Sequence, residues 1–148
     1  MSEASASSRS CAFCRIVRGE VTSHVVFEDE RSLAFLDNRP LFPGHSLLVP
    51  RDHHETLLDL PDDLITTMFT NARLLARAME EGLQAEGSFV ALNNRVSQSV
   101  PHVHVHIVPR RRKDGLRGFF WPRQKYSDEA HAGETARVLR ATVDELRR

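Results

Sequence analysis

The sequence lacks the features that mark several large classes of protein. No apolar stretch approaches the ~20 residues of a membrane-spanning helix, so we expect no membrane partner. The 20 Lys and Arg balance 20 Asp and Glu, and without a basic excess we expect no nucleic-acid partner. A Gly-rich phosphate loop is absent, which excludes P-loop enzymes. With only two cysteines and no signal-peptide core, the expected location is the cytoplasm.

Length and composition predict one ordinary globular domain. The chain has 148 residues, of which 41% are hydrophobic and 27% charged, and this is enough to bury a core. Residues 1–10 are rich in Ser and Ala, and we expect a disordered leader there. Residues 11–148 are predicted to form a single domain, with residues 113–148 as its C-terminal loop and helix.

Hydrophobic periodicity predicts an α+β fold with a five-stranded antiparallel sheet, one long helix and a C-terminal helix. Pro61 and the two acidic residues after it favour a helix start, and Gly82 favours its end. The apolar stripe Leu64, Met68, Leu75 and Met79 follows helical spacing. The expected strands cover 24–30, 32–37, 45–49, 89–92 and 100–108, and the C-terminal helix covers 128–148.

Three histidines at every second position dominate the chemistry of the chain. His102, His104 and His106 alternate with β-branched apolar residues, which favour strands. Alternate side chains of a strand point to opposite faces, so we expect the imidazoles on one face and the apolar residues in the core. Such a row supplies nucleophiles, proton carriers and metal ligands. The basic run 110–113 follows it and is either a solvated loop or a phosphate-attracting rim.

The run 102–108 resembles the signature of the histidine triad (HIT) family, His-φ-His-φ-His-φ-φ, where φ is apolar. Four further stretches resemble the family in order along roughly residues 11–110: FCRIVRGE at 13–20, LAFLD at 33–37 with PGH at 43–45, LVPRDH at 48–53, and QSV at 98–100. The resemblance implies a five-stranded antiparallel sheet, a nucleotide partner, hydrolase or transferase activity and a homodimer.

The resemblance also implies roles for individual residues. His104 is the implied nucleophile, which attacks the α-phosphorus and holds a covalent nucleotidyl intermediate. His106 matches a phosphate-binding position, and Ser99 a position that binds the leaving group or the phosphate. The implied substrate-binding residues are Asp37 at the ribose, Phe13, Ile16 and Phe35 around the base, and Gln98 and Asn93, or Asn94 in its place, near the phosphate.

The chemistry of imidazole adds one requirement. A neutral imidazole that attacks through one nitrogen carries its proton on the other, so His104 needs a hydrogen-bond acceptor on that side. We expect a backbone carbonyl to fill this role.

Cys11 and Cys14 have the spacing of metal ligands. A thioredoxin-like redox pair needs a βαβ context that the sequence lacks, which leaves two inert thiols or a structural zinc site. Some bacterial members of the HIT family carry this motif and bind zinc with two histidines. The matching positions are His53 and His102, with His54 as an alternative to His53, and His45 and His24 as weaker ones. No organic cofactor is expected.

Three functional hypotheses follow. The first is an enzyme that cleaves a dinucleoside polyphosphate or an adenosine phosphoramidate. The second is a nucleotide-binding regulatory or scaffold protein with incidental turnover. The third is a metal-binding module without chemistry. The complete triad and Ser99 favour the enzyme, because a protein that only binds nucleotides has no need of a nucleophile.

Overall fold

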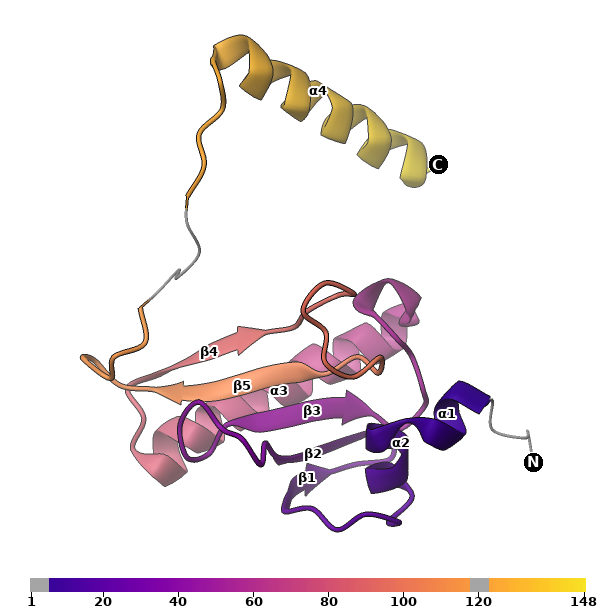
Figure 1. Ribbon diagram of the computed structural model, residues 1–148, viewed down its shortest axis with the longest axis vertical. Coiled ribbons are helices and arrows are strands. Elements are labelled where there is room, and N and C mark those ends of the chain that lie inside the picture. The colour runs from indigo at the N-terminus through magenta and orange to yellow at the C-terminus, as the bar shows by residue number, and fades with distance from the viewer. Residues whose placement is uncertain (1–5, 118–122) are drawn as a thin grey trace. The chain divides into compact units, whose positions relative to one another are not determined.

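The strands form one five-stranded antiparallel sheet. The structure is a computed structural model, and it describes residues 6–117 and 123–148. The strand order is β1-β2-β3-β5-β4 (Figure 1). The strands are β1 (Val25–Glu28), β2 (Ser32–Leu36), β3 (Ser46–Pro50), β4 (Gly87–Ala91) and β5 (Val105–Arg110). This sheet, its long helix and a C-terminal helix confirm the predicted fold class.

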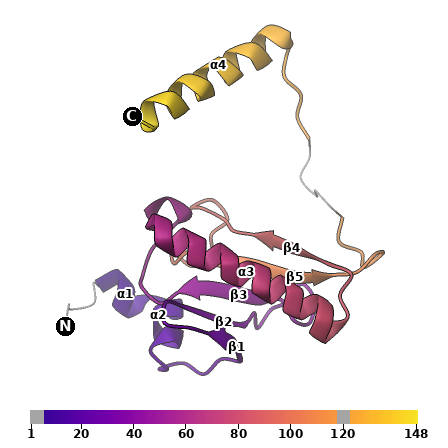
Figure 2. The same ribbon diagram turned by 180° about the vertical axis from the view of Figure 1, so that it is seen from behind.

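Helices cover the two faces of the sheet. The long helix α3 (Asp62–Leu83) lies on one face, which Figure 2 shows in front. The short helices α1 (Ala6–Ser10) and α2 (Ala12–Val17) lie on the side turned to the viewer in Figure 1. A 3₁₀ turn, η1 (Leu57–Asp59), comes between β3 and α3. Helix α1 occupies part of the segment expected to be a disordered leader, and Arg18 donates to carbonyls at its residues Ser8 and Arg9.

The main core lies between α3 and the sheet. All four residues of the predicted stripe are buried, and they pack against apolar residues from β2, β3 and the β5 region. This burial is the main stabilisation of an amphipathic helix. The core contains Ala34, Leu48, Leu60, Leu64, Met68, Ala72, Leu75, Met79, Ala85, Val103, Val105 and Ile107.

A second, smaller core lies on the opposite face of the sheet. Helix α2 contributes Phe13 and Cys14, which pack with Cys11 and with Phe35 and Val49 from the central strands. Strand β3 is therefore buried along its whole length. The histidine face of the sheet is the one that this second core covers in part.

The fifth strand starts later than predicted. β5 begins at Val105, so His102 and His104 lie in the segment before it rather than in a strand over 100–108. The β3–β5 register pairs Leu48 with Val105, and its continuation would reach Pro50, which has no N–H to donate. The ladder therefore stops. Alternation still holds, because the apolar residues at 103, 105 and 107 all join the α3 core.

The chain divides into two compact units, one ending at Asp114 and the other beginning at Gly115. This boundary lies next to residue 113, where the expected C-terminal loop and helix begin. That residues 11–148 form a single domain stays a prediction. Helix α4 (Glu129–Leu146) forms the second unit, and the Asp128 side chain caps it by accepting from the His131 N–H. Residues 118–122 lie outside the described residues. None of the described helices is long and apolar enough to cross a membrane.

Candidate active site and metal site

The ring of His104 is held by the backbone of a neighbouring histidine. Its Nδ1 lies 2.8 Å from the carbonyl oxygen of His102. A carbonyl only accepts hydrogen bonds, so Nδ1 carries the proton and Nε2 keeps its lone pair. The structure therefore supplies the carbonyl acceptor that the sequence chemistry requires of a nucleophilic imidazole.

A second chain of hydrogen bonds orients His106 through His45. The Leu41 N–H donates to Nδ1 of His45 over 3.1 Å, and this leaves the proton of neutral His45 on Nε2. That Nε2 lies 3.0 Å from Nδ1 of His106 and donates to it. Neutral His106 then carries its proton on Nε2. The two backbone contacts thus give opposite tautomers, with a lone pair at Nε2 of His104 and an N–H at Nε2 of His106.

Asp37 lies beside this chain. Its Oδ2 is 3.7 Å from Nε2 of His45, and its Oδ1 accepts from the Arg39 N–H. Asp37, His45 and His106 are close enough to bind a metal as a group. A metal on Nε2 of His45 would move that ring's proton to Nδ1, where it would face the Leu41 N–H donor. We therefore interpret the group as a hydrogen-bond relay.

Burial keeps these histidines neutral. Desolvation lowers the pKa of His104 and of His45, partly opposed by the negative charge of Asp37 and, for His104, also by its bond to His102. Burial lowers the pKa of His106 to about 4, with repulsion from His104 and His45 when they are protonated and partial opposition from Asp37. All three rings are therefore uncharged near pH 7, and a neutral ring is the nucleophilic form of imidazole.

Aromatic rings form a wall beside His104. Phe13 contacts His104 edge-on with ring centroids 5.0 Å apart, and it contacts Phe35 in the same way at 5.4 Å. Ile16 packs against the same cluster from α2. The three residues predicted to surround a base therefore lie in one cluster, in which Phe13 contacts His104.

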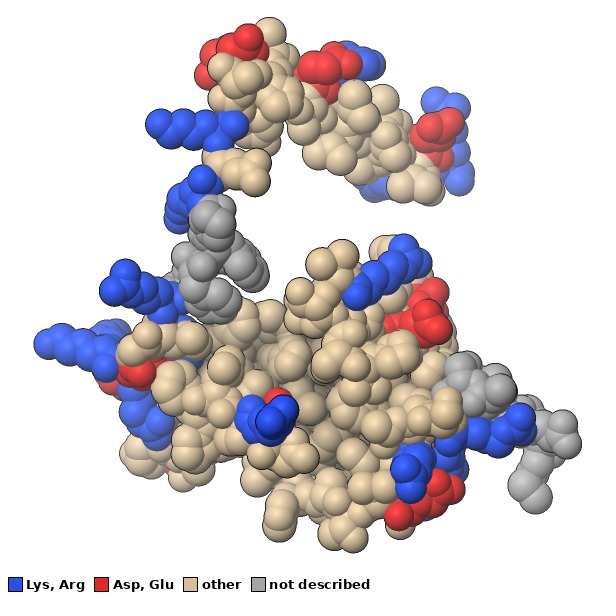
Figure 3. Space-filling view, viewed as in Figure 1, with Lys and Arg blue, Asp and Glu red and all other residues tan. Residues whose placement is uncertain are grey.

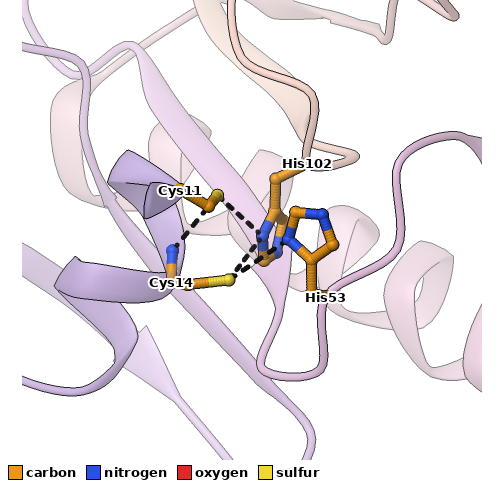
Figure 4. Close-up of side chains that lie close together, drawn as sticks. All are labelled: Cys11, Cys14, His53 and His102. Carbon is orange, nitrogen blue, oxygen red and sulfur yellow. Dashed lines mark hydrogen bonds between the residues drawn. The ribbon is translucent and has the colours of Figure 1, made fainter. Parts of the chain in front are cut away.

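The four predicted metal ligands converge from three segments (Figure 4). Cys11 and Cys14 come from the start of α2, His53 from the loop after β3, and His102 from the segment before β5. Nδ1 of His102 lies 3.5 Å from Sγ of Cys11 and 3.4 Å from Sγ of Cys14. Nδ1 of His53 lies 3.2 Å from Sγ of Cys14.

These separations suit a tetrahedral metal. Zinc bonds of about 2.3 Å to sulfur and about 2.0 Å to nitrogen place such ligands roughly 3.5 Å apart. The Pro50 carbonyl lies 2.8 Å from Nε2 of His102 and holds the proton there, so Nδ1 is free to bind a metal, as in other oriented ligand histidines. Nε2 of His53 is buried without a hydrogen-bond partner. Burial also raises the pKa of the Cys14 thiol and lowers that of His102 to about 4.

Three predicted residues lie in the loop between β4 and β5. Ser99 is exposed, and Asn93 donates to the Ser97 carbonyl. The amide of Gln98 donates to the Glu55 carbonyl and accepts from the Arg95 N–H. Gln98 therefore ties this loop to the loop after β3, and both ends of its amide are engaged. Asn94 likewise accepts from the Leu57 N–H.

Two of the four basic residues in the run after the histidines form salt bridges. Arg110 pairs with Asp114 at 2.6 Å, and Arg112 pairs with Glu86. Figure 3 shows basic side chains at the edge where β5 ends, whereas the middle of this face carries few charges. Arg110 is four residues beyond His106, about 13 Å along a strand.

His45 is the site residue whose role the sequence did not predict; there it was only a weak zinc candidate. The register pairs Leu47 with His106, and His45 precedes Leu47 by two residues, so it lies on the same side of the sheet and diagonal to His106. Knowledge that β3 and β5 are neighbours would have been enough to find it, but strand order cannot be read from one sequence.

Comparisons with known proteins agree with the fold and the motifs. A family model described as the HIT domain matches residues 18–113. An uncharacterised HIT-like protein of Saccharolobus solfataricus is 38% identical over 122 residues, covering 80% of this chain and 88% of that protein. The adenosine 5'-monophosphoramidase of Saccharomyces cerevisiae is 35% identical over 136 residues, covering 90% and 83%. The crystal structure of a Zn-bound histidine triad family protein from Mycobacterium smegmatis superimposes with a TM-score of 0.71 at 37% identity, covering 94% and 99%.

Proposed function

Because the chain belongs to the HIT family, we propose that it cleaves a nucleotide at the α-phosphate through a covalent nucleotidyl intermediate on His104. The observation that carries this proposal is the 2.8 Å contact between Nδ1 of His104 and the His102 carbonyl. It holds the proton away from Nε2, which is the atom that would attack.

The reaction has two balanced steps. The Nε2 lone pair of His104 forms a bond to the α-phosphorus, while the bond from phosphorus to the leaving oxygen or nitrogen breaks and its electron pair departs with the leaving group, which takes a proton from solvent where it is an amine. Water then attacks the same phosphorus and gives up a proton to solvent, the electron pair of the P–N bond returns to Nε2, and a nucleoside monophosphate is released. Nδ1 keeps its proton and donates it in a hydrogen bond to the His102 carbonyl throughout. This hydrogen bond offsets the positive charge that builds on the ring.

The other residues serve binding and electrostatics. The Nε2–H of His106 donates to a phosphate oxygen, and phosphoryl transfer depends mainly on such positioned donors. Phe13, Ile16 and Phe35 enclose the base, and Asp37 accepts from the ribose hydroxyls. In the loop before His102, Ser99 contacts the leaving group or the phosphate, and Gln98 and Asn93 hold the loop at the phosphate.

The proposed substrate is a dinucleoside polyphosphate or an adenosine phosphoramidate. A relative is named as an adenosine 5'-monophosphoramidase, which favours an AMP-containing substrate. Cys11, Cys14, His53 and His102 would hold a structural zinc ion, which when bound ties three segments of the chain together. We also propose a homodimer, which sedimentation velocity tests directly.

A rapid-quench experiment tests the covalent step. Diadenosine tri- and tetraphosphate, adenosine phosphoramidate and nucleotide sugars are compared at equal concentration, and each is followed for a burst of leaving group and for labelled protein. We expect label on His104 and none on the His104→Asn variant. His104→Gly with free imidazole restores turnover, whereas His104→Ala does not. His24→Asn, a change at an exposed histidine, is the matched control.

Two results would refute the proposal. No turnover across the whole substrate panel with the wild type would exclude the hydrolase. Tight AMP binding that never labels His104 would favour the nucleotide-binding regulatory or scaffold protein instead.

A further inference from the structure

We propose that His102 couples the metal site to the nucleophile, so that His104 holds its reactive tautomer only while the metal ligands are bound to a metal. This inference rests on the proposed covalent role of His104 and concerns its regulation.

His102 takes part in both sites with different atoms. Its ring offers Nδ1 to the two cysteines, and its main-chain oxygen accepts from Nδ1 of His104. The side chain and the carbonyl belong to one residue, and this residue is completely buried. A rotation of the His102 ring alone leaves its carbonyl in place, so the coupling has to run through the backbone of this residue.

The adjoining peptides link the remaining ligand to the same point. The Val103 N–H donates to the His54 carbonyl over 2.7 Å, and His54 directly follows the ligand His53. The His102 N–H donates to the Val100 carbonyl over 2.8 Å. The peptide groups on both sides of His102 are thus held, and one of them is held by the loop that carries His53.

Without a metal, the contacts among the four ligands are weak. Three sulfur–nitrogen contacts of 3.2–3.5 Å remain, and thiols are poor hydrogen-bond donors. The partnerless Nε2 of His53 gives that ring no second anchor. Only hydrogen bonds then hold the loop after β3 to the segment before β5. When the loop at His53 and His54 shifts, the peptide between His102 and Val103 turns with it, and His104 loses its acceptor.

Loss of the acceptor changes which nitrogen of His104 faces the substrate. With the proton distributed between Nδ1 and Nε2, part of the population presents an N–H to the phosphorus and cannot attack. The rate of attack falls in proportion to the fraction that keeps the Nδ1–H form.

Nitrogen-15 NMR of the histidine rings tests the coupling independently of activity. The wild-type protein is compared as loaded with one equivalent of zinc and after removal of zinc by a chelator, with circular dichroism to show that both forms are folded. The loaded form should show the Nδ1–H tautomer of His104 alone, and the chelated form a mixture of two tautomers. The rate of His104 labelling should fall on chelation in proportion to the fraction of the Nδ1–H tautomer that is lost from the spectrum, and recover on zinc addition.

A pair of neighbouring variants provides the matched control. His53→Ala removes a ligand and should reproduce the chelated spectrum without any chelator. His54→Ala leaves its main-chain carbonyl in place and should behave as the wild type. If His54→Ala, and not His53→Ala, releases zinc and gives the mixed spectrum, the assignment of His53 is overturned.

The results separate this inference from the proposed function. An unchanged Nδ1–H tautomer and an unchanged labelling rate after zinc removal would overturn the coupling and leave the covalent mechanism intact. A loaded protein that shows the tautomer change on chelation but never labels His104 would overturn the covalent mechanism and support the coupling. A protein that binds no zinc would overturn the coupling directly.

Discussion

The low pKa of His106 predicts a specific loss of stability in mild acid. Burial and the neighbouring charges of His104 and His45 lower this pKa to about 4 in the folded protein, against about 6.5 in an unfolded chain. Between these values the unfolded state binds more protons than the folded state. The free energy of unfolding therefore rises with pH in this window. As the pH falls from about 6.5 towards 4, the folded protein loses stability through this group.

The size of the loss follows from the two pKa values. At pH 7 the folded state is almost fully deprotonated and the unfolded state about three-quarters so, and the penalty is about 0.2 kcal/mol; at pH 4.5 it reaches about 2.5 kcal/mol, a difference of roughly 2 kcal/mol. The variant His106→Gln cannot take up this proton and should lose about 2 kcal/mol less than the wild type between pH 7 and 4.5.

Urea unfolding at the two pH values measures this difference. His45, His102 and His104 are present in both proteins, so most of their contributions cancel when the two losses of stability are subtracted. His24→Gln, at an exposed position, should lose as much stability as the wild type between pH 7 and 4.5. Equal losses of stability for the wild type and His106→Gln would show that His106 does not titrate below its ordinary range, and the argument for its neutral state would fail.

Three further predictions address the relay, the backbone and the metal. His45→Phe removes the donor to Nδ1 of His106 and should lower kcat/KM by about 10- to 100-fold, while His45→Gln keeps an N–H and should lose less; steady-state rates that do not differ between the two would contradict the relay. Gly44→Ala should destabilise the protein by about 1–3 kcal/mol, because φ is +104° and an added Cβ would lie 2.5 Å from Cδ1 of Leu83. Adding Leu83→Ala should restore little in urea unfolding, since that side chain can move and the backbone strain remains. A zinc chelator should lower the Tm and added zinc should restore it; a Tm that does not respond would argue against a structural metal.

The fold and the identity of the chemical groups were predictable from local patterns. The helix stripe from Leu64 to Met79 has a strong period, and α3 ends within one residue of the predicted Gly82. The alternation around His104 predicted correctly which side chains enter the core, because the side-chain period of extended backbone does not depend on whether the ladder is complete.

The parts that were not predicted depend on contacts between distant segments. The late start of β5 follows from Pro50 in a strand whose pairing was unknown. The role of His45 depends on β3 lying beside β5, and the engagement of Gln98 depends on the loop after β3. Helix α2 has only six residues, too few for a periodic signal, although its two cysteines and Phe13 were recognised from their spacing and resemblance.

The alternation of core and site residues around β5 has a consequence for how this segment can change. Val103, Val105 and Ile107 are buried against α3, and the imidazoles between them face the other way. An insertion or deletion of one residue here would exchange the two faces, placing polar rings in the apolar core and valines at the site. The segment from His102 to Ile107 should therefore keep its fold after single substitutions but not after a change in length.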